Sequence, residues 1–268
     1  MRIALNSGIY PAAWSPLEKL EATARSGAVG LELNVDATQL WTRRLDGPAR
    51  GRLAERAREL GIVWTSLCLN AHWVFNLASP DVRIRDVGIS LLLESIDLAC
   101  DLGAKVILVP GCDQEESPAN EWDLFRGAVM QGVTRAEQAG VVLALEAVGK
   151  PFLYDSAKLR QMVDACGGSR ALGLYLDAGN AAFRHQPWAD EVRLAGDRLA
   201  GTVHVKDWVP GDRSRWYLGA GSVDLAATIA TLREAGYDGY LVVELPPDPR
   251  DPEKIANDAV RYLEEMLK

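Results

Sequence analysis

One phrase recurs along the chain: a helix-like segment, a single glycine, and then a short apolar segment rich in β-branched residues. It occurs as RSGAVGLEL, ELGIVWTSL, DLGAKVILV, QAGVVLALE and EAGYDGYLVVE. Glycine is preferred just past a helix end, because it adopts the left-handed backbone conformation needed there without strain. The apolar segments lack strict alternation, which is typical of strands buried on both faces of a parallel sheet. The repeat therefore predicts alternating helices and parallel strands.

Eight strand candidates and eight helix candidates alternate from one end of the chain to the other. The strand candidates are 2–7, 29–34, 62–69, 105–110, 141–146, 172–177, 201–207 and 240–245. The helix candidates are 16–26, 49–60, 81–102, 121–139, 155–166, 187–196, 223–235 and 251–267. Eight such units close into a (β/α)8 TIM barrel, and the 268 residues suit the roughly 250 typical of that fold. No linker divides the chain, so we expect a single α/β domain over residues 1–268.

The charge balance narrows the range of partners. Lysines and arginines number 29 against 37 aspartates and glutamates, which gives a net charge of −8 and a pI of about 5.0. Binding to phosphate backbones needs a basic stripe, so we do not expect a nucleic-acid partner. No apolar run approaches the roughly 20 residues that cross a membrane. The four cysteines are widely spaced and the N-terminus lacks a signal-peptide pattern, which together predict a cytoplasmic protein.

Glu146, Asp177, His204 and Glu244 each end a short apolar run. They are 31, 27 and 40 residues apart, a spacing that each time spans one strand and one helix. Parallel strands of a barrel end at the same rim, where TIM barrels carry their active sites, so the four side chains are expected to converge. Three carboxylates and one imidazole suit a divalent cation. We predict one ion, with Mn²⁺ first and Mg²⁺, Co²⁺ or Zn²⁺ also compatible. The competing interpretation is that each is only a polar residue where a strand meets water.

Several motifs resemble those of a known family. They are NLASPDVRIRDVGISLLLESIDLACDLGA (76–104), LALE (143–146), LDAGN (176–180), VHVKD (203–207), LGAGSVD (218–224) and GYDGYLVVE (236–244). In combination, and over most of the chain, they resemble the xylose isomerase-like TIM barrels, the sugar phosphate isomerase/epimerase superfamily. The resemblance implies that Glu146, Asp177, His204 and Glu244 are the metal ligands. It also implies that the two glutamates carry out the proton transfers of the reaction.

The chemistry implied by the resemblance is isomerisation or epimerisation of a sugar or sugar phosphate. A proton is removed beside a metal-chelated carbonyl, an enediolate forms, and a proton is returned at another place or on the other face. Two positions depart from the family pattern. Asn180 stands where sugar epimerases often have histidine, and Ala220 stands in a loop that often reads Gly-Glu-Gly. Both changes remove a polar group near the substrate, so a keto-sugar or inosose dehydratase, or a 3-keto-glycoside lyase, stays open as the alternative.

Six residues are predicted to contact a carbohydrate substrate. They are His72, Lys206, Trp14, Trp73, Asn180 and His185. Lys206 points to the same side of its strand as His204, because side chains alternate, and would either stabilise an oxyanion or pair with a carboxylate. The tryptophans would stack on sugar faces or pack at the rim. Glu32, at the end of the second strand, would orient a hydroxyl group or form an ion pair.

Two other classes of function fit less well. An endonuclease IV-like enzyme needs many histidines for a trinuclear zinc site, and this chain has three. A non-enzymatic sugar-binding barrel has no need of four metal ligands. The resemblance also leaves a homo-oligomer open, because barrels of this family often pair. The turn-rich loop 208–223, which follows the seventh strand, is expected to cover the site.

Overall fold

The structure is a computed structural model that describes residues 1–112, 118–148, 152–207, 209, 217–248 and 251–268. Within these residues, eight strands pair in sequence order, all parallel, and the first pairs with the last to close a barrel. The strands are β1 Arg2–Asn6, β2 Gly30–Asn34, β3 Val63–Cys68, β4 Val106–Pro110, β5 Val142–Glu146, β6 Leu172–Asp177, β7 Leu199–Val205 and β8 Tyr240–Val243. The predicted (β/α)8 TIM barrel is confirmed.

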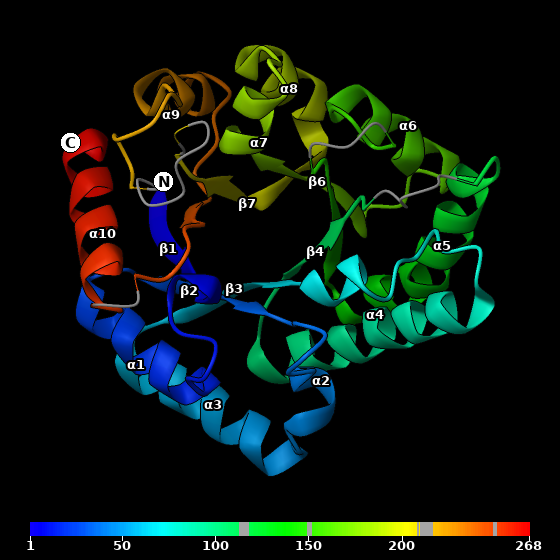
Figure 1. The fold of residues 1–268 in the computed structure, drawn as a ribbon, viewed down its shortest axis with the longest axis horizontal. Coiled ribbons are helices and arrows are strands. Elements are labelled where there is room, and N and C mark those ends of the chain that lie inside the picture. The colour runs from blue at the N-terminus through cyan, green and yellow to red at the C-terminus, as the bar shows by residue number, and fades with distance from the viewer. Residues whose placement is uncertain (113–117, 149–151, 208, 210–216, 249–250) are drawn as a thin grey trace.

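The helices form a ring around the barrel, as Figure 1 shows. They are α1 Pro16–Ser26, α2 Trp41–Arg44, α3 Gly47–Leu60, α4 Val82–Leu102, α5 Glu121–Ala139, α6 Ser156–Ala165, α7 Ala178–Phe183, α8 Trp188–Ala195, α9 Leu225–Glu234 and α10 Lys254–Leu267. Short 3-10 turns are η1 Ser7–Ile9, η2 Asn70–Trp73 and η3 Gly196–Arg198. The last helix, α10, packs beside β1, so the two ends of the chain meet on one side of the ring (Figure 1).

Local sequence signals set the ends of the helices, and α1 shows how. The Ser15 side chain accepts a hydrogen bond from the backbone N–H of Glu18, and the Glu18 carboxylate accepts one from the backbone N–H of Ser15. Pro16 fills the first helical position, where its missing N–H costs nothing. The helix stops at Gly27, whose φ of 90° lies in the left-handed region. The glycine of the recurring phrase thus acts as the helix stop that its position predicts.

Alternate residues of each strand face opposite sides of the barrel wall. In β5, Leu143 belongs to the large core cluster that also contains helix residues, whereas Ala144 belongs to a small separate cluster with Tyr175 of β6. The small cluster therefore lies inside the barrel. Glu146 has the same parity as Ala144, and Asp177 has the same parity as Tyr175. Both carboxylates consequently emerge at the top of the barrel interior.

Two differences from the predicted elements bear on the site. β7 covers Leu199–Val205 instead of 201–207, so Lys206 and Asp207 lie past the end of the strand. A short helix, α7, begins directly after β6 in a segment for which no helix was predicted. Of the loop predicted to cover the site, 208–223, residues 208 and 210–216 lie outside the described residues.

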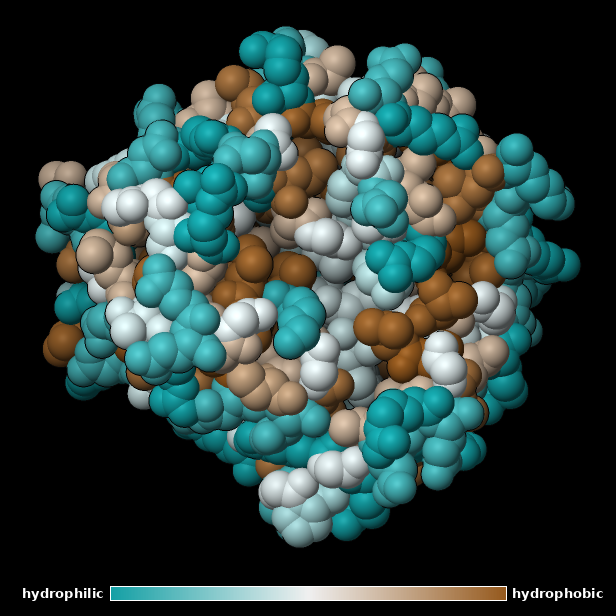
Figure 2. Space-filling view, turned by 180° about the vertical axis from the view of Figure 1, so that it is seen from behind, coloured by the Kyte–Doolittle hydropathy of each residue, from teal (hydrophilic) through white to brown (hydrophobic). Residues whose placement is uncertain are grey.

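The face opposite to that of Figure 1 carries hydrophilic residues around its edge, with hydrophobic residues gathered nearer its middle (Figure 2). In the described part of the chain, none of the helices is both long enough and apolar enough to span a membrane.

Candidate metal centre and active site

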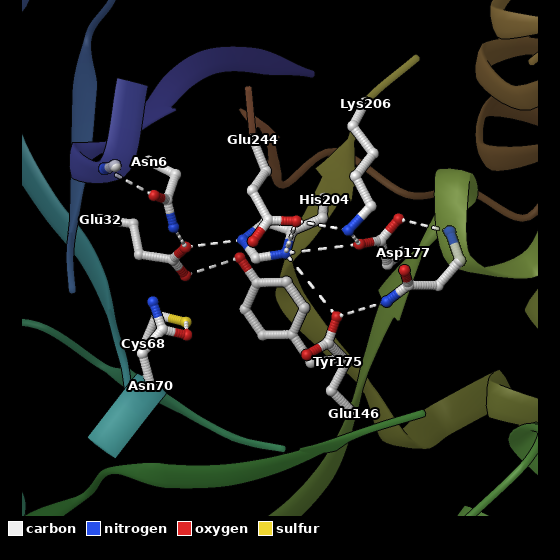
Figure 3. A network of polar contacts seen from close by, with 12 residues as sticks. Asn6, Glu32, Cys68, Asn70, Glu146, Tyr175, Asp177, His204, Lys206 and Glu244 are labelled. Atoms are coloured by element: carbon white, nitrogen blue, oxygen red, sulfur yellow. Dashed lines mark hydrogen bonds and ion pairs between the residues drawn. The ribbon is translucent and has the colours of Figure 1, made fainter. Parts of the chain in front are cut away.

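Four side chains from β5 to β8 converge at the carboxyl-terminal rim of the barrel (Figure 3). Glu146 and Asp177 are the last residues of β5 and β6. His204 is the last but one residue of β7, and Glu244 directly follows β8. The His204 Nδ1 atom lies 3.9 Å from Glu146 Oε1, 3.7 Å from Asp177 Oδ2 and 3.6 Å from Glu244 Oε2. The structure thus brings together the four residues that the strand-end spacing selects.

The positions of these donor atoms fit a single divalent cation. Two ligands that each lie about 2.0–2.2 Å from an ion are at most about 4.4 Å apart. The three distances from His204 Nδ1 fall below that limit. Ligand atoms of Glu146, Asp177 and His204 also lie within 4.8 Å of one another. In addition, the buried His204 Nδ1 has no hydrogen-bond partner among the described residues, although carboxylates surround it. The donor set and this ring nitrogen therefore suit an ion, and the assignment of the four as ligands stays a prediction.

Glu32 holds the opposite side of the His204 ring. Its buried carboxylate accepts hydrogen bonds from Asn6 Nδ2 (2.6 Å), Ser66 Oγ (2.6 Å), the Tyr175 hydroxyl (2.8 Å) and His204 Nε2 (2.6 Å). Burial alone would raise the pKa of Glu32, but His204 and the other donors outweigh it and the pKa is lowered. An ionised Glu32 requires a proton on His204 Nε2, and this contact turns the other ring nitrogen, Nδ1, toward the three carboxylates. Of the two roles considered for Glu32, the structure shows the ion pair.

Lys206 reaches the same rim from the residue after β7. Its Nζ atom lies 2.6 Å from Asp177 Oδ2 and 2.6 Å from Glu244 Oε2 (Figure 3). Burial would lower the pKa of Lys206, but attraction to Asp177, Glu244 and Glu146 outweighs it and the pKa is raised. Of the two interpretations that the sequence left open, the structure shows the pairing with carboxylates.

Asn180 ties two of the candidate ligands to α7. Its backbone N–H donates to Asp177 Oδ1 (2.9 Å), which makes Asp177 the N-cap of that helix. Its side-chain Nδ2 donates to Glu146 Oε1 (3.0 Å). Arg184, just past α7, donates to the backbone carbonyl of Ala147 at 2.7 Å and so holds the end of β5. Asn180 was predicted as a substrate contact, and its amide is directed at Glu146.

The two candidate catalytic glutamates differ in their surroundings. Burial is the main influence on Glu146, and it raises the pKa of that carboxyl group to about 7. Burial also acts on Glu244, but Lys206 and His204 outweigh it, so the pKa of Glu244 is lowered. Surroundings that push the pKa values of two carboxyl groups apart are typical of acid–base pairs. Before an ion is bound, Glu146 therefore holds a proton more readily than Glu244.

His72 is buried in the turn η2, which follows β3. Its Nε2 donates to the backbone carbonyl of Gly88 in α4, at 3.1 Å. Burial lowers the pKa of His72 to about 4, so the ring is neutral near pH 7. Its predicted contact with a substrate stays a prediction, and in this structure one ring nitrogen is directed at α4.

The remaining predicted substrate contacts lie in loops and turns after the strands. Trp14 is half-buried and stacks on Tyr10, with ring centroids 5.6 Å apart. Trp73 is 49% exposed, and His185 is exposed with a φ of 57°. In the part of the chain that the structure describes, no hydrogen bond or ion pair joins Trp14, Trp73 or His185 to the four candidate ligands. Their assignment as substrate contacts also stays a prediction.

Asp207 is a residue of the site region to which the sequence assigned no role. Its buried carboxylate accepts hydrogen bonds from the backbone N–H groups of Gly219 (3.0 Å), Gly221 (2.9 Å) and Val223 (3.1 Å). It therefore anchors the Gly-Ala-Gly loop to the end of β7. The motifs VHVKD and LGAGSVD carry the signal, because an acidic residue and a glycine-rich loop can form such an anion nest.

Comparisons with known proteins show the family of the chain. The xylose isomerase-like TIM barrel family model matches residues 20–266. The chain is 33% identical over 254 residues to L-ribulose-5-phosphate 3-epimerase UlaE of Salmonella paratyphi C (strain RKS4594), and the match covers 89% of this chain and 86% of that protein. A solved structure of L-ribulose 3-epimerase has a TM-score of 0.81 at 25% identity, covering 99% of this chain and 94% of that one. The IOLI protein with a bound zinc atom also has a TM-score of 0.81, at 20% identity and with 100% and 96% coverage, a likeness of fold alone. The chain therefore belongs to the xylose isomerase-like TIM barrel family.

Proposed function

We propose that the protein is a divalent-metal-dependent 3-epimerase of a five-carbon ketose or of its 5-phosphate. The chain is an enzyme of the sugar isomerase and epimerase class, in keeping with its family and with the epimerases that it resembles. The observation that carries the proposal is the position of His204 Nδ1, which faces one oxygen of each of three carboxylates at 3.6–3.9 Å. The pentulose is proposed because two relatives are named for L-ribulose 5-phosphate and L-ribulose.

The proposed cofactor is one divalent ion held by Glu146, Asp177, His204 and Glu244. When bound, the ion would supply positive charge beside the carbonyl of the sugar and so favour negative charge on its oxygen. Oxygen-rich donor sets suit Mn²⁺, which we propose first, and Mg²⁺, Co²⁺ and Zn²⁺ accept the same donors. The zinc atom bound in the IOLI structure is in keeping with a divalent ion in this fold.

Glu146 and Glu244 are the proposed proton carriers. They reach the same space from β5 and β8, and each has an oxygen within 3.9 Å of His204 Nδ1. A ketose between them presents one face of carbon 3 to each carboxylate. One carboxylate takes the proton from carbon 3, next to the carbonyl at carbon 2, and the other carboxyl group returns a proton to the opposite face. A C–H bond is broken and re-formed with inverted configuration, and no other atom is gained or lost.

The remaining proposals concern the substrate and the setting. The partner is a small carbohydrate, contacted by Lys206, Asn180, His72, Trp14, Trp73 and His185, with neither nucleic acid nor membrane as a partner. Lys206 is already at the rim, where an ammonium group suits an oxyanion or a phosphate. A cytoplasmic location is proposed from the widely spaced cysteines, and a homo-oligomer from the family resemblance.

The test is an exchange experiment in D₂O. The Mn²⁺-loaded protein is incubated with L-ribulose, L-ribulose 5-phosphate and other ketopentoses, with 3-keto sugars as a comparison. We expect deuterium at carbon 3 and accumulation of the 3-epimer. Glu146→Gln and Glu244→Gln should each abolish the exchange, because neither amide can accept the proton. Glu264→Gln, on the exposed face of α10, is the matched control and should keep full activity.

Two results would contradict the proposal. Release of water or of an aglycone in place of an epimer would assign the site to a dehydratase or a lyase. Full exchange in either glutamine variant would remove that glutamate from the reaction. The metal content of each variant is measured in parallel, so that loss of the ion is distinguished from loss of the proton carrier.

A further inference from the structure

The ammonium group of Lys206 binds the same oxygens that the proposed metal would use. Its Nζ atom lies 2.6 Å from Asp177 Oδ2 and 2.6 Å from Glu244 Oε2. These are the two oxygens that face His204 Nδ1 at 3.7 Å and 3.6 Å. Figure 3 shows the Lys206 side chain ending between the two carboxylates. A cation that belongs to the chain itself thus stands at the candidate metal centre.

The fold provides a place for the Lys206 side chain. Gly179, in the first turn of α7, lies directly against its stem. A Cβ atom added at Gly179 would come within 2.3 Å of Lys206 Cγ and within 3.1 Å of Cε. The Lys206 side chain is only 17% exposed. An alanine at position 179 would therefore push the stem aside while leaving its charge intact.

The carboxylates can be paired either with the Lys206 ammonium group or with a divalent ion, and electrostatic repulsion between these two cations makes them alternatives. Glu146, Asp177 and Glu244 gather three carboxyl groups at one rim, and buried like charges are costly unless they are paired. Lys206 pairs two of them in the structure. An ion bound to the same oxygens would stand within a few ångströms of Nζ, where two positive charges repel each other strongly. Binding of the ion and the Lys206 bridge therefore exclude each other.

We propose that Lys206 is an internal counter-ion, which holds Asp177 and Glu244 together in the metal-free protein and leaves them when the ion binds. This inference rests on the metal centre of the proposed function. The chain gives up a charge-assisted hydrogen bond to Glu244 and an ion pair with Asp177 for each ion that it binds, so Lys206 weakens the affinity for metal and stabilises the metal-free fold. The released ammonium group stays at the mouth, where it faces the substrate.

The test compares metal binding and stability in matched variants of the whole chain. Lys206→Met removes the charge and keeps the length of the stem, whereas Gly179→Ala keeps the charge and displaces the stem. Lys158→Met removes one charge from the exposed face of α6 and is the control. Mn²⁺ binding to the metal-free proteins is measured by calorimetric titration, and melting temperatures are measured with and without Mn²⁺.

We expect Lys206→Met to bind Mn²⁺ roughly tenfold more tightly, because the competing contacts of Lys206 with Asp177 and Glu244 are gone. Its metal-free form should melt below the unaltered protein, and saturation with Mn²⁺ should remove most of that difference. Gly179→Ala should also raise the affinity for Mn²⁺ and lower the melting temperature of the metal-free form, and Lys158→Met should change neither. If Lys206→Met cannot be prepared without metal, the Mn²⁺ affinity of Gly179→Ala tests the inference in its place.

Unchanged or weaker Mn²⁺ binding in the Lys206 and Gly179 variants would overturn the inference and leave the metal centre standing. Equal melting of the metal-free forms of Lys206→Met and the unaltered protein would also overturn it. If the unaltered protein binds no divalent ion, the metal centre itself fails and the inference falls with it.

Discussion

Glu32 determines the orientation of the His204 ring, although Glu32 is not one of the candidate metal ligands. Four donors converge on its carboxylate, from Asn6, Ser66, Tyr175 and His204. They come from β1, β3, β6 and β7, so only the closed barrel assembles them. The sequence marks Glu32 as a polar residue near the end of a strand, but no local pattern reveals partners so far apart in the chain. This is why its role could not be predicted beyond an ion pair or a hydroxyl contact.

Glu32→Gln is expected to weaken Mn²⁺ binding by about 10–100-fold, the usual cost of losing the partner that orients a metal-binding histidine. A neutral amide no longer favours the proton on His204 Nε2. Calorimetric titration measures the change. Ser66→Ala is the control: it removes one of the four donors, leaves the His204 contact in place and should have a smaller effect. Equal affinity in Glu32→Gln and the unaltered protein would contradict this role.

Among the elements, those with strong local signals were predicted and the short irregular ones were not. α1 and α5 have the bounds that periodicity and end signals indicate, 16–26 and 121–139. α7 was missed because its six residues, AGNAAF, are too few to show a helical period. β7 starts and ends two residues earlier than predicted, and the β6–β7 register shifts between Leu174 and Leu176. Such irregularities depend on pairing with a neighbouring strand, which a single sequence does not display.

The contact between η2 and α4 should depend on pH through His72. Burial lowers its pKa from 6.5 to about 4, so the unfolded chain binds a proton in this range that the folded chain does not. Stability is therefore lost as the pH falls from about 6.5 to about 4, and the loss levels off below that. The full difference amounts to about 3 kcal/mol of unfolding free energy.

His72→Gln isolates this effect, because glutamine can donate to the Gly88 carbonyl without titrating. Urea unfolding is measured at about pH 7.5 and about pH 4 for both proteins. Between about pH 7.5 and about pH 4, the unfolding free energy of the variant should fall by about 3 kcal/mol less than that of the unaltered protein. Identical losses in the two proteins would show that His72 is not held neutral by burial.

For the whole molecule, the repeat predicted the fold and the strand ends predicted which residues meet. Eight units each carry the same signals, so an error in one boundary leaves the barrel unchanged. The rule that barrel strands end at one rim placed Glu146, Asp177, His204 and Glu244 together without any structure. No comparable rule predicts where the side chains of loop residues point. One ring nitrogen of His72 is directed at α4 because of the packing of η2, and the position of His72 in the sequence could not reveal this.

We propose that one divalent ion is held where β5 to β8 end. The most direct measurement is anomalous X-ray diffraction from crystals of the Mn²⁺-loaded protein. We expect one Mn²⁺ per chain, about 2.0–2.4 Å from donor atoms of Glu146, Asp177, His204 and Glu244, with Lys206 Nζ moved away from Asp177 Oδ2. An ion bound elsewhere in the chain, or no anomalous peak at this rim, would contradict it.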